Sequence, residues 1–265
     1  MNDLCTITRY YGSNEKDLEK LWRFIEQAQT YSKRILIGVN IEKDLTDCIK
    51  KYSQQQHLSN ISVDFIAIQP WIGISTPLNI LLNHIPNDQS YILIQSVEIQ
   101  CTSQHIDCLR SYLQEDNILC VGAALDGHQI FTNDLNKTYL PLQGDTSPWN
   151  TFAIWNLEKL RRTGFPMCSD FVNPSGMEDA AVIALQQKLF GGRTKNRALL
   201  IHFHNNVQWL NQFDYDQDRC SKHEIKMKSK NNRTKQLLQM LDISDSDQED
   251  KIGVEYIVNN NISKL

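Results

Sequence analysis

The chain has 265 residues, of which 41% are hydrophobic and 22% are charged, and its net charge at pH 7 is −4. This length allows one large α/β domain with a substantial core, and the slightly acidic balance excludes a general electrostatic attraction to nucleic acid or anionic membranes. No apolar run approaches the roughly 20 residues that a membrane span needs, and the amino terminus lacks the layout of a signal peptide. The seven cysteines are scattered singly. This pattern indicates neither a disulfide framework nor a structural zinc site, and it favours a reducing, cytoplasmic setting.

Strand-like and helix-like segments alternate through the first half of the chain. Runs of apolar residues predict strands over 4–10, 34–41, 63–68, 91–94 and 118–125. Apolar residues at steps of three and four predict helices over 15–31, 45–56, 76–85 and 106–113. Alternation over short links predicts an α/β fold, with a mostly parallel sheet covered by helices on both faces.

The regular alternation of strand-like and helix-like segments does not continue in the second half of the chain. Ser147 and Pro148 occupy positions that favour the start of a helix, and an apolar stripe follows from Trp149 to Leu160. We therefore expect a helix over this stretch, and a later strand over 197–203.

The end of the chain is first basic and then acidic. The segment 222–240 predicts one basic helix. The residues 244–265 combine an acidic run with an Asn-rich end, so we expect a loosely held or disordered tail.

The strand that starts at Tyr91 ends in polar residues. Its apolar run is followed by Gln95, Ser96 and Glu98, and then by a helical pattern. In open α/β sheets, ligands bind at the carboxyl ends of the strands. The sequence therefore predicts ligand-binding groups at this strand end.

Four sequence features follow one another in a specific order. The first is Trp71 and Gly73 followed by Leu78 and Asn79, and the second is the strand end at 95–98. The third is the loop 144–150 entering a helix that ends at Gly164 and Phe165, and the fourth is the acidic pair Glu178 and Asp179. This order resembles the GT-A fold of nucleotide-sugar glycosyltransferases, especially the large family 2 type. The resemblance spans residues 4–205.

The resemblance implies a domain organisation and an activity. It implies a Rossmann-like GT-A domain over 1–215, with a nucleotide-binding half (1–125) and an acceptor half (126–215), a basic helical appendage over 216–243 and a tail over 244–265. The chain would then be an enzyme that transfers a sugar from a nucleoside-diphosphate sugar, with UDP as the expected nucleotide, to an acceptor hydroxyl. The alternative is a binding or scaffold protein that keeps the fold without catalysis.

The resemblance also places residues around the expected site. Those expected around the nucleotide are Thr8, Arg9, Tyr10 and Asn40, at the ends of the first two strands. Those expected at the diphosphate and sugar are Gln95, Ser96 and Glu98. Trp149 and Asn150 are expected to shape the acceptor side.

The metal site is where this chain departs from the family that it resembles. In that family the strand end usually carries an Asp-x-Asp motif, which holds a divalent metal on the donor diphosphate. Glu98 is the one carboxylate at that position here, so donor binding is expected to depend on Glu98 and only mildly on Mg²⁺ or Mn²⁺. His202 and His204 share one strand face and have a spacing that can bind a metal, although the wet face of an edge strand is the favoured interpretation. No redox cofactor is expected.

The late acidic pair is interpreted as one structural and one catalytic residue. Glu178 stands three residues after Ser175, which is the spacing of a capping box, so its expected role is to cap a helix. The resemblance assigns the catalytic base to this pair, and an inverting transfer needs a base to take the proton of the acceptor hydroxyl. We therefore expect Asp179 to be the base.

The basic helix offers a second way to hold a diphosphate. Its cations recur at spacings of three and four, which can line one helix face: Arg219, His223, Lys226, Lys230 and Arg233. With so few carboxylates at the strand end, fixed cations can stabilise the charge of a leaving nucleoside diphosphate. The alternative is a solvated helix face without a catalytic role, and no nucleic-acid partner is expected.

Overall fold

The computed structural model describes residues 3–11, 15–40, 61–130, 139–203, 207–210, 217–244, 246–247 and 251–259. The helix predicted over 45–56 and the side chains of His204 and Arg219 lie outside the described residues. Among the described residues, no helix has the length and apolar character to span a membrane.

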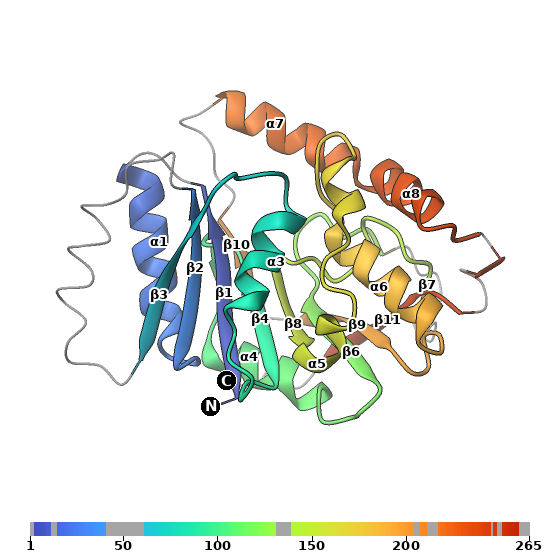
Figure 1. Cartoon of the computed structure of the whole chain (residues 1–265), viewed down its shortest axis with the longest axis horizontal. Helices are drawn as coiled ribbons and strands as arrows, with labels where there is room; N and C mark the ends of the chain where they lie inside the picture. The colour runs from blue at the N-terminus through green and yellow to red at the C-terminus, as the bar shows by residue number, and fades with distance from the viewer. Residues whose placement is uncertain are drawn as a thin grey trace.

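A nine-stranded sheet forms the centre of the described fold, in the order β3-β2-β1-β4-β8-β6-β9-β11-β7 (Figure 1). Its strands are β1 (Leu4–Tyr10), β2 (Arg34–Asn40), β3 (Ser62–Ile68), β4 (Tyr91–Gln95), β6 (Ile118–Ala123), β7 (Tyr139–Leu140), β8 (Phe152–Asn156), β9 (Arg197–Phe203) and β11 (Val254–Asn259). Strands β3, β2, β1 and β4 pair in parallel, and so do β6, β9 and β11. Strands β8 and β7 run antiparallel to their neighbours. The mostly parallel sheet predicted from the sequence is confirmed.

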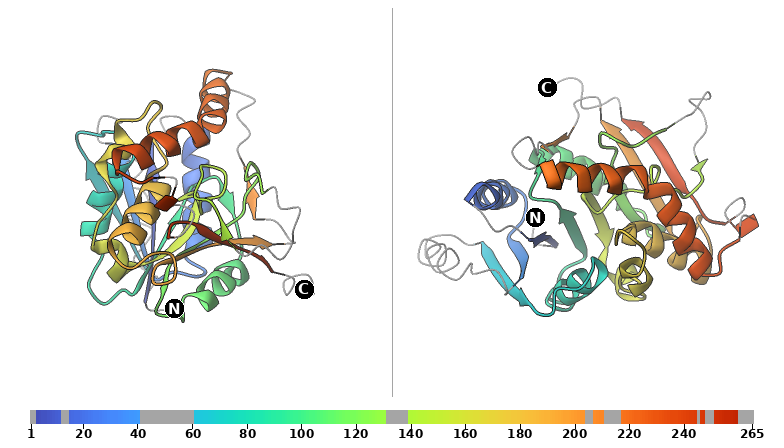
Figure 2. Two further views of the ribbon diagram at one scale, coloured as in Figure 1. Left: turned by 90° about the vertical axis from the view of Figure 1, so that its right-hand side faces the viewer. Right: turned by 90° about the horizontal axis from the view of Figure 1, so that it is seen from above.

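Helices cover both faces of the sheet, as the alternating pattern predicts. They are α1 (Glu15–Ala28), α3 (Ser75–Asn83), α4 (Ser103–Tyr112), α5 (Leu157–Arg161), the 3₁₀ turn η1 (Met167–Asp170), α6 (Glu178–Leu189), α7 (Gln217–Lys228) and α8 (Lys230–Met240). Helices α3, α5 and α6 lie on one face and α1 and α4 on the other, while α7 and α8 run across the top edge of the sheet (Figures 1 and 2). A two-stranded ribbon of β5 (Ile99–Gln100) and β10 (Gln208–Trp209) lies beside the main sheet.

The helix predicted from Ser147 is wrong over Phe152–Asn156, which forms the antiparallel strand β8, and within this stretch only Leu157–Arg161 is helical, as α5. The side chains from Phe152 to Trp155 have no exposed surface, since β8 lies inside the sheet between β4 and β6. A strand buried on both faces reads as a continuous apolar run without the alternation of a half-buried strand. Such a short run also fits helical spacing, which is the ambiguity that misled the sequence interpretation.

The capping box predicted for α6 is also wrong. Helix α6 begins at Glu178 itself, after Gly176 at φ 149° and Met177 at φ 65°, and no side chain caps its first turn. The left-handed backbone at Met177 turns the chain just before the helix. The Ser175 hydroxyl instead donates to the Asp170 carbonyl (3.2 Å), which leaves the Glu178 carboxylate available for other contacts.

The carboxyl-terminal part of the chain is more ordered than the sequence predicts. The single basic helix is two helices, α7 and α8, which meet at Ser229. The predicted loose tail contains β11, which pairs in parallel with β9 through five residue pairs from Glu255 to Asn259. The expectation of a disordered tail is therefore wrong for these residues.

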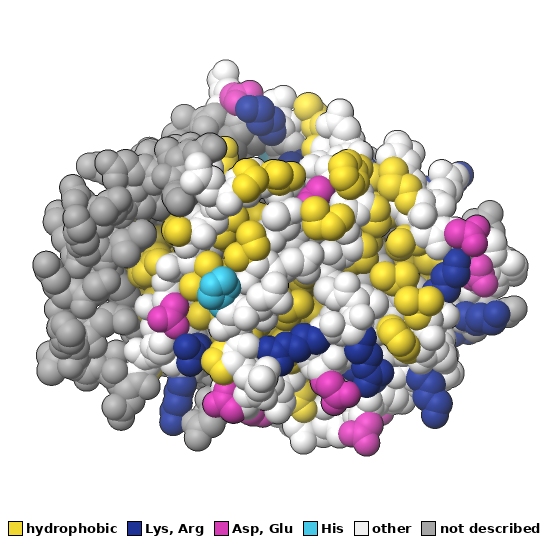
Figure 3. All heavy atoms as spheres, viewed as in Figure 1, with side chains coloured by type: hydrophobic (Ala, Val, Ile, Leu, Met, Phe, Trp, Pro, Cys, Tyr) yellow, Lys and Arg dark blue, Asp and Glu magenta, His cyan; other side chains and the backbone are white. Residues whose placement is uncertain are grey.

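Exposed apolar side chains gather on the face that carries α3, η1 and α6 (Figure 3). They include Ile72, Met167 and Phe171, of which Phe171 is 77% exposed. These three side chains do not line the cavity described below.

Candidate functional site

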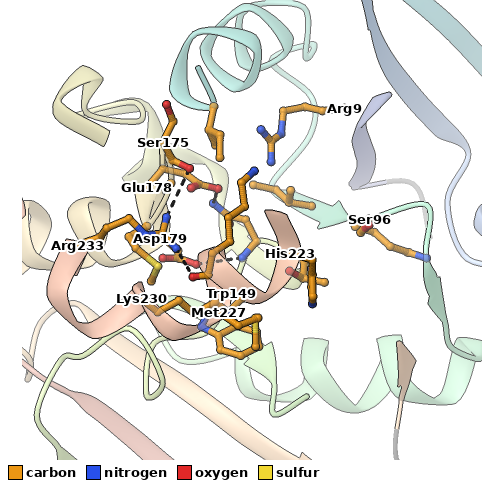
Figure 4. A pocket seen from close by; sticks show the side chains of 18 of the residues that line it. Arg9, Ser96, Trp149, Ser175, Glu178, Asp179, His223, Met227, Lys230 and Arg233 are labelled. Atoms are coloured by element: carbon orange, nitrogen blue, oxygen red, sulfur yellow. Dashed lines mark hydrogen bonds between the residues drawn. The ribbon is translucent and has the colours of Figure 1, made fainter. Parts of the chain in front are cut away.

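A cavity of about 220 Å³ opens at the carboxyl ends of β1 and β4, beneath α7 and α8 (Figure 4). Most of the residues expected around the site line it: Thr8, Arg9, Gln95, Ser96, Trp149, Asn150, Glu178, Asp179, His223, Lys226 and Lys230. They come from segments far apart in the sequence. The fold thus brings the predicted strand end, the acidic pair and the basic helix to one place.

Some expected residues lie elsewhere. Tyr10 and Asn40 are buried at the ends of β1 and β2, outside this cavity. Glu98 lines a second cavity, of about 340 Å³, where its carboxylate is 3.8 Å from the Lys20 ammonium group. The His202 ring packs against Tyr256, and its strand β9 lies between β6 and β11. The interpretation of His202 as part of an edge strand is therefore wrong.

The acidic pair is buried and held by Asn150. The Asn150 side-chain amide donates to Glu178 Oε1 (3.2 Å), and the Asn150 backbone N–H donates to Asp179 Oδ2 (3.3 Å). The amide oxygen of Asn150 accepts from the Trp155 indole (2.8 Å), which fixes the orientation of the amide. Asp179 Oδ1 also accepts from the Ala180 backbone N–H (2.6 Å). The two carboxylates are thus oriented by neutral donors.

The pKa of Asp179 suits a general base that works near neutral pH. Desolvation and the neighbouring charge of Glu178 together raise the pKa of Asp179 to about 7, against the opposing effects of backbone hydrogen bonds and Lys230. A carboxylate with this pKa can take a proton from a hydroxyl more readily than an ordinary surface aspartate.

Trp149 forms a fixed aromatic wall of the cavity. Its indole N–H donates to the Gly144 carbonyl (2.7 Å), and its ring stacks on His128 with 3.6 Å between centroids. The Lys230 ammonium group lies over the Trp149 ring, 2.7 Å from its centroid. Burial lowers the pKa of Lys230 to about 6, while Asp179 acts in the opposite direction.

Arg233 fastens α8 over the cavity. It is 3% exposed, and its guanidinium group donates to the Ser229 hydroxyl and to three backbone carbonyls, those of Pro174, Ser175 and Lys226. Gly176 leaves the space for this group, because a Cβ there would collide with Arg233. The basic-helix pattern included Arg233, but nothing in the sequence shows that it binds the loop before α6.

Two further cavity residues escaped the sequence interpretation. Trp209 stands at an angle to Trp149, with 6.0 Å between their ring centroids, and Met227 lies on the same side of the cavity. Trp209 belongs to a two-residue strand, which is too short to produce a periodic pattern.

Comparison with known proteins supports the fold through structure and not through sequence. No protein-family model matches the sequence, and no curated protein matches it in sequence. The mannosyltransferase PcManGT from Pyrobaculum calidifontis, solved with GDP-Man and Mn²⁺, superposes with a TM-score of 0.59 at 11% identity, over 89% of this chain and 68% of that chain.

Two other solved structures share the architecture. Glucosyl-3-phosphoglycerate synthase from Mycobacterium tuberculosis, in complex with Mn²⁺, UDP-glucose and phosphoglyceric acid, has a TM-score of 0.54 at 12% identity, over 92% of this chain and 81% of that chain. The 4-diphosphocytidyl-2C-methyl-D-erythritol synthase from Anaerococcus prevotii has a TM-score of 0.54 at 10% identity, over 84% of this chain and 96% of that chain. The chain has a GT-A-type fold, as predicted.

Proposed function

We propose that this chain binds a nucleoside-diphosphate sugar in the cavity beneath α7 and α8 and transfers the sugar to an acceptor hydroxyl. The observation that supports this most directly is the meeting of a buried carboxylate pair with several cations in one cavity. The cavity also lies where open α/β sheets bind ligands, at the carboxyl ends of strands. UDP and GDP are the nucleotides to test first, since the two sugar transferases with the same fold were solved with them.

The proposed chemistry is an inverting displacement with Asp179 as the base. The acceptor oxygen attacks the anomeric carbon of the sugar and gives its proton to the Asp179 carboxylate. The bond between the anomeric carbon and the diphosphate oxygen breaks at the same time, and its electron pair leaves with the nucleoside diphosphate. Asn150, which binds both carboxylates, holds the base in position.

The acceptor would enter on the side of Trp149 and Asn150. Both side chains line the cavity, and Asn150 is hydrogen-bonded to both carboxylates of the acidic pair. The adjacent Asp179 would then reach the hydroxyl of a bound acceptor.

One observation favours a second candidate, a binding protein that keeps the fold without catalysis. The strand end reads Gln95, Ser96, Val97 and Glu98 in place of the acidic motif usual in the resembled family. Such a protein would bind the nucleotide sugar and leave it intact.

Release of nucleoside diphosphate separates the two candidates. The purified full chain is incubated with UDP-sugars and GDP-sugars, with and without a mixture of hydroxyl acceptors, and free UDP or GDP is measured over time. A donor that is consumed supports the proposed transfer. Binding of a donor without any release, at every pH from 6 to 9, would contradict it and support the second candidate.

A further inference from the structure

The end of β4 does not offer the ligands that a divalent cation needs. The amide oxygen of Gln95 already accepts a hydrogen bond from the Tyr31 hydroxyl (2.6 Å), and the amide nitrogen donates to the Ile99 carbonyl (3.4 Å). Mg²⁺ and Mn²⁺ prefer several oxygen ligands, with carboxylates foremost among them. Within the described ranges, no cluster of three or more His, Cys, Asp or Glu side chains could hold a metal.

Glu98, the carboxylate expected to bind the metal, is committed elsewhere. Its carboxylate accepts from the Trp209 indole (3.4 Å) and lies 3.8 Å from the Lys20 ammonium group. It lines the second cavity and not the one that contains Asp179. The residues at this strand end therefore do not fit the metal site of the resembled family.

Two cations of the main cavity, on Arg9 and Lys226, are attracted by Glu178 but are not fixed by a hydrogen bond or ion pair within the described residues. The guanidinium group of Arg9, at the end of β1, points into the cavity (Figure 4) and forms no hydrogen bond or ion pair with any described residue. The same holds for the ammonium group of Lys226 on α7 within the described part of the chain. Desolvation lowers the pKa of Lys226, and the nearby charge of Arg9 lowers it further.

Arg9 repels Lys226 while Glu178 attracts both, and an anion that enters between the two cations adds counter-charge and reduces this repulsion. The elements that carry them are fixed in place. Arg9 follows a strand in the centre of the sheet, and Arg233 ties α8 and the end of α7 to the loop before α6. The cavity is thus prepared for a negative ligand before the ligand arrives.

Lys230, at the start of α8, supplies a third cation. Its ammonium group is held over Trp149, next to Asp179, and burial disfavours its charge. A bound anion would favour the charged form of Lys230. Arg233 cannot serve in the same way, because its donors are occupied by carbonyl groups and the Ser229 hydroxyl.

From this arrangement, and resting on the proposed function, we propose that side-chain cations replace the divalent metal in this protein. Arg9, Lys226 and Lys230 bind the diphosphate of the donor and stabilise the charge that develops on it as the sugar leaves. Donor binding is accordingly independent of divalent metal.

Binding of UDP and GDP to the full chain, measured by calorimetry, tests the proposal. Each nucleotide is titrated once in EDTA and once in Mn²⁺, at low and at moderate salt. We expect one of them to bind equally well with and without metal, and more weakly at higher salt, because the interaction is between charges. Binding that appears only with Mn²⁺ would overturn the proposal and leave the proposed function standing. If neither nucleotide binds under any condition, the proposed function fails together with this inference.

Single substitutions then identify the cations. Arg9→Gln and Lys226→Gln should each weaken nucleotide binding in EDTA by roughly 10- to 100-fold, the usual effect of losing a charged hydrogen-bond donor. The matched control is Lys228→Gln, which removes the same charge from α7 at a side chain that is 80% exposed and pairs with Glu224. The control should bind as the unchanged chain does.

Melting temperatures of all variants establish that each one folds. If Arg9→Gln and Lys226→Gln fold and bind as well as the Lys228→Gln control, the cations do not hold the diphosphate and the proposal is wrong. Should a variant unfold, Arg9→Lys and Lys226→Arg keep the charge and change the geometry. These charge-preserving variants should retain measurable binding in EDTA, and a complete loss in folded protein would count against the proposal.

Discussion

Two walls of the same cavity differ in how their polar groups are used. At the end of β4, Gln95 is bound to Tyr31 and Ile99, and Glu98 turns away to Lys20. On the opposite wall, the ammonium group of Lys226 forms no hydrogen bond or ion pair with a described residue, and that of Lys230 lies over the rings of Trp149 and Trp209. Both walls contain polar residues, but of the two only the wall formed by α7 and α8, the helical wall, leaves its charges available to a ligand.

The comparison shows that the type of a residue does not by itself identify a ligand-binding group. A buried polar side chain satisfies its hydrogen bonds within the protein wherever it can, because an unsatisfied group is costly. The side chains left without partners beside a cavity are therefore the ones to test. Four predictions test whether the two walls differ in this way.

The largest effect should follow a change in the acidic pair beneath the helical wall. Asp179→Asn removes the proposed base and keeps the size of the side chain, so turnover should fall roughly 100-fold or more. Nucleotide binding should stay nearly the same, because Asp179 does not contact the diphosphate in the proposed arrangement. Product formation and calorimetric binding are measured on the same preparation. An Asp179→Asn variant with full activity would mean that another residue takes the proton.

The next effect concerns the residue that holds the helical wall in place. Arg233→Ala should lower the free energy of unfolding by roughly 3 kcal/mol, because it leaves buried carbonyl groups of the loop before α6 without a donor. The matched control is Lys235→Ala, on the exposed side of α8. Denaturant titration of both variants measures the difference. Equal stability of the two variants would show that Arg233 does not anchor the wall.

A moderate effect is expected on the pH dependence of turnover. The pKa of Asp179 is raised to about 7, so the base loses its proton and activity rises as the pH increases through about 7. Glu178→Gln removes the negative charge that contributes to this rise, and the acid limb of kcat/KM should move to lower pH. Gln keeps an oxygen that can accept from Asn150. An unchanged limb, or a shift to higher pH, would show that Glu178 does not set the pKa of the base.

The smallest effect should come from the strand-end wall. Glu98→Gln should change UDP or GDP binding by less than about 2-fold. Glu98 lies in the second cavity, and the effects of substitutions at separate sites are usually independent. This expectation reverses the one drawn from the sequence, in which donor binding depends on Glu98. A loss comparable to that of Lys226→Gln would mean that the two walls work together and that the contrast between them is wrong.

The carboxyl-terminal segment needs point substitutions and not truncation as its test. Removing everything after Asp218 would be the simplest way to ask whether the basic helices matter. Helix α8 buries Leu237 and Leu238 in the core, and β11 pairs with β9 in the main sheet. Truncation would therefore remove part of the core, and a loss of binding could not be assigned to the cations.

The sequence predicted the strands best where the apolar pattern was clear. Strands β1 and β9 have the predicted boundaries, and α1, α3 and α4 lie where apolar residues recur at helical steps. Strand β8 was missed because burial on both faces removes the alternation that identifies a strand. Helix α6 was found, but its first turn was misread because the left-handed backbone at Met177 cannot be recognised from residue types alone.

The candidate site was predicted in its components and not in its assembly. The order of motifs indicated the fold, and the acidic pair and the basic helix face could be read from residue types and spacing. Their meeting in one cavity depends on contacts across long stretches of chain, such as Arg233 with Pro174 and Asn150 with Glu178. Such contacts leave no periodic signal in a single sequence.

The amino-acid sequence establishes which polar and charged side chains this protein contains, whereas their availability to a ligand depends on the folded structure. Local periodicity fixes helices and strands because side-chain burial repeats along each element. Whether Gln95 or Lys226 faces a ligand depends on which partners the folded chain brings within hydrogen-bonding distance. The Gln95 amide accepts a hydrogen bond of 2.6 Å from Tyr31, whereas the Lys226 ammonium group lies in the fields of Arg9, Arg233 and Glu178 without a hydrogen bond to a described residue. The first is committed to the fold, and the second is left for a negatively charged ligand.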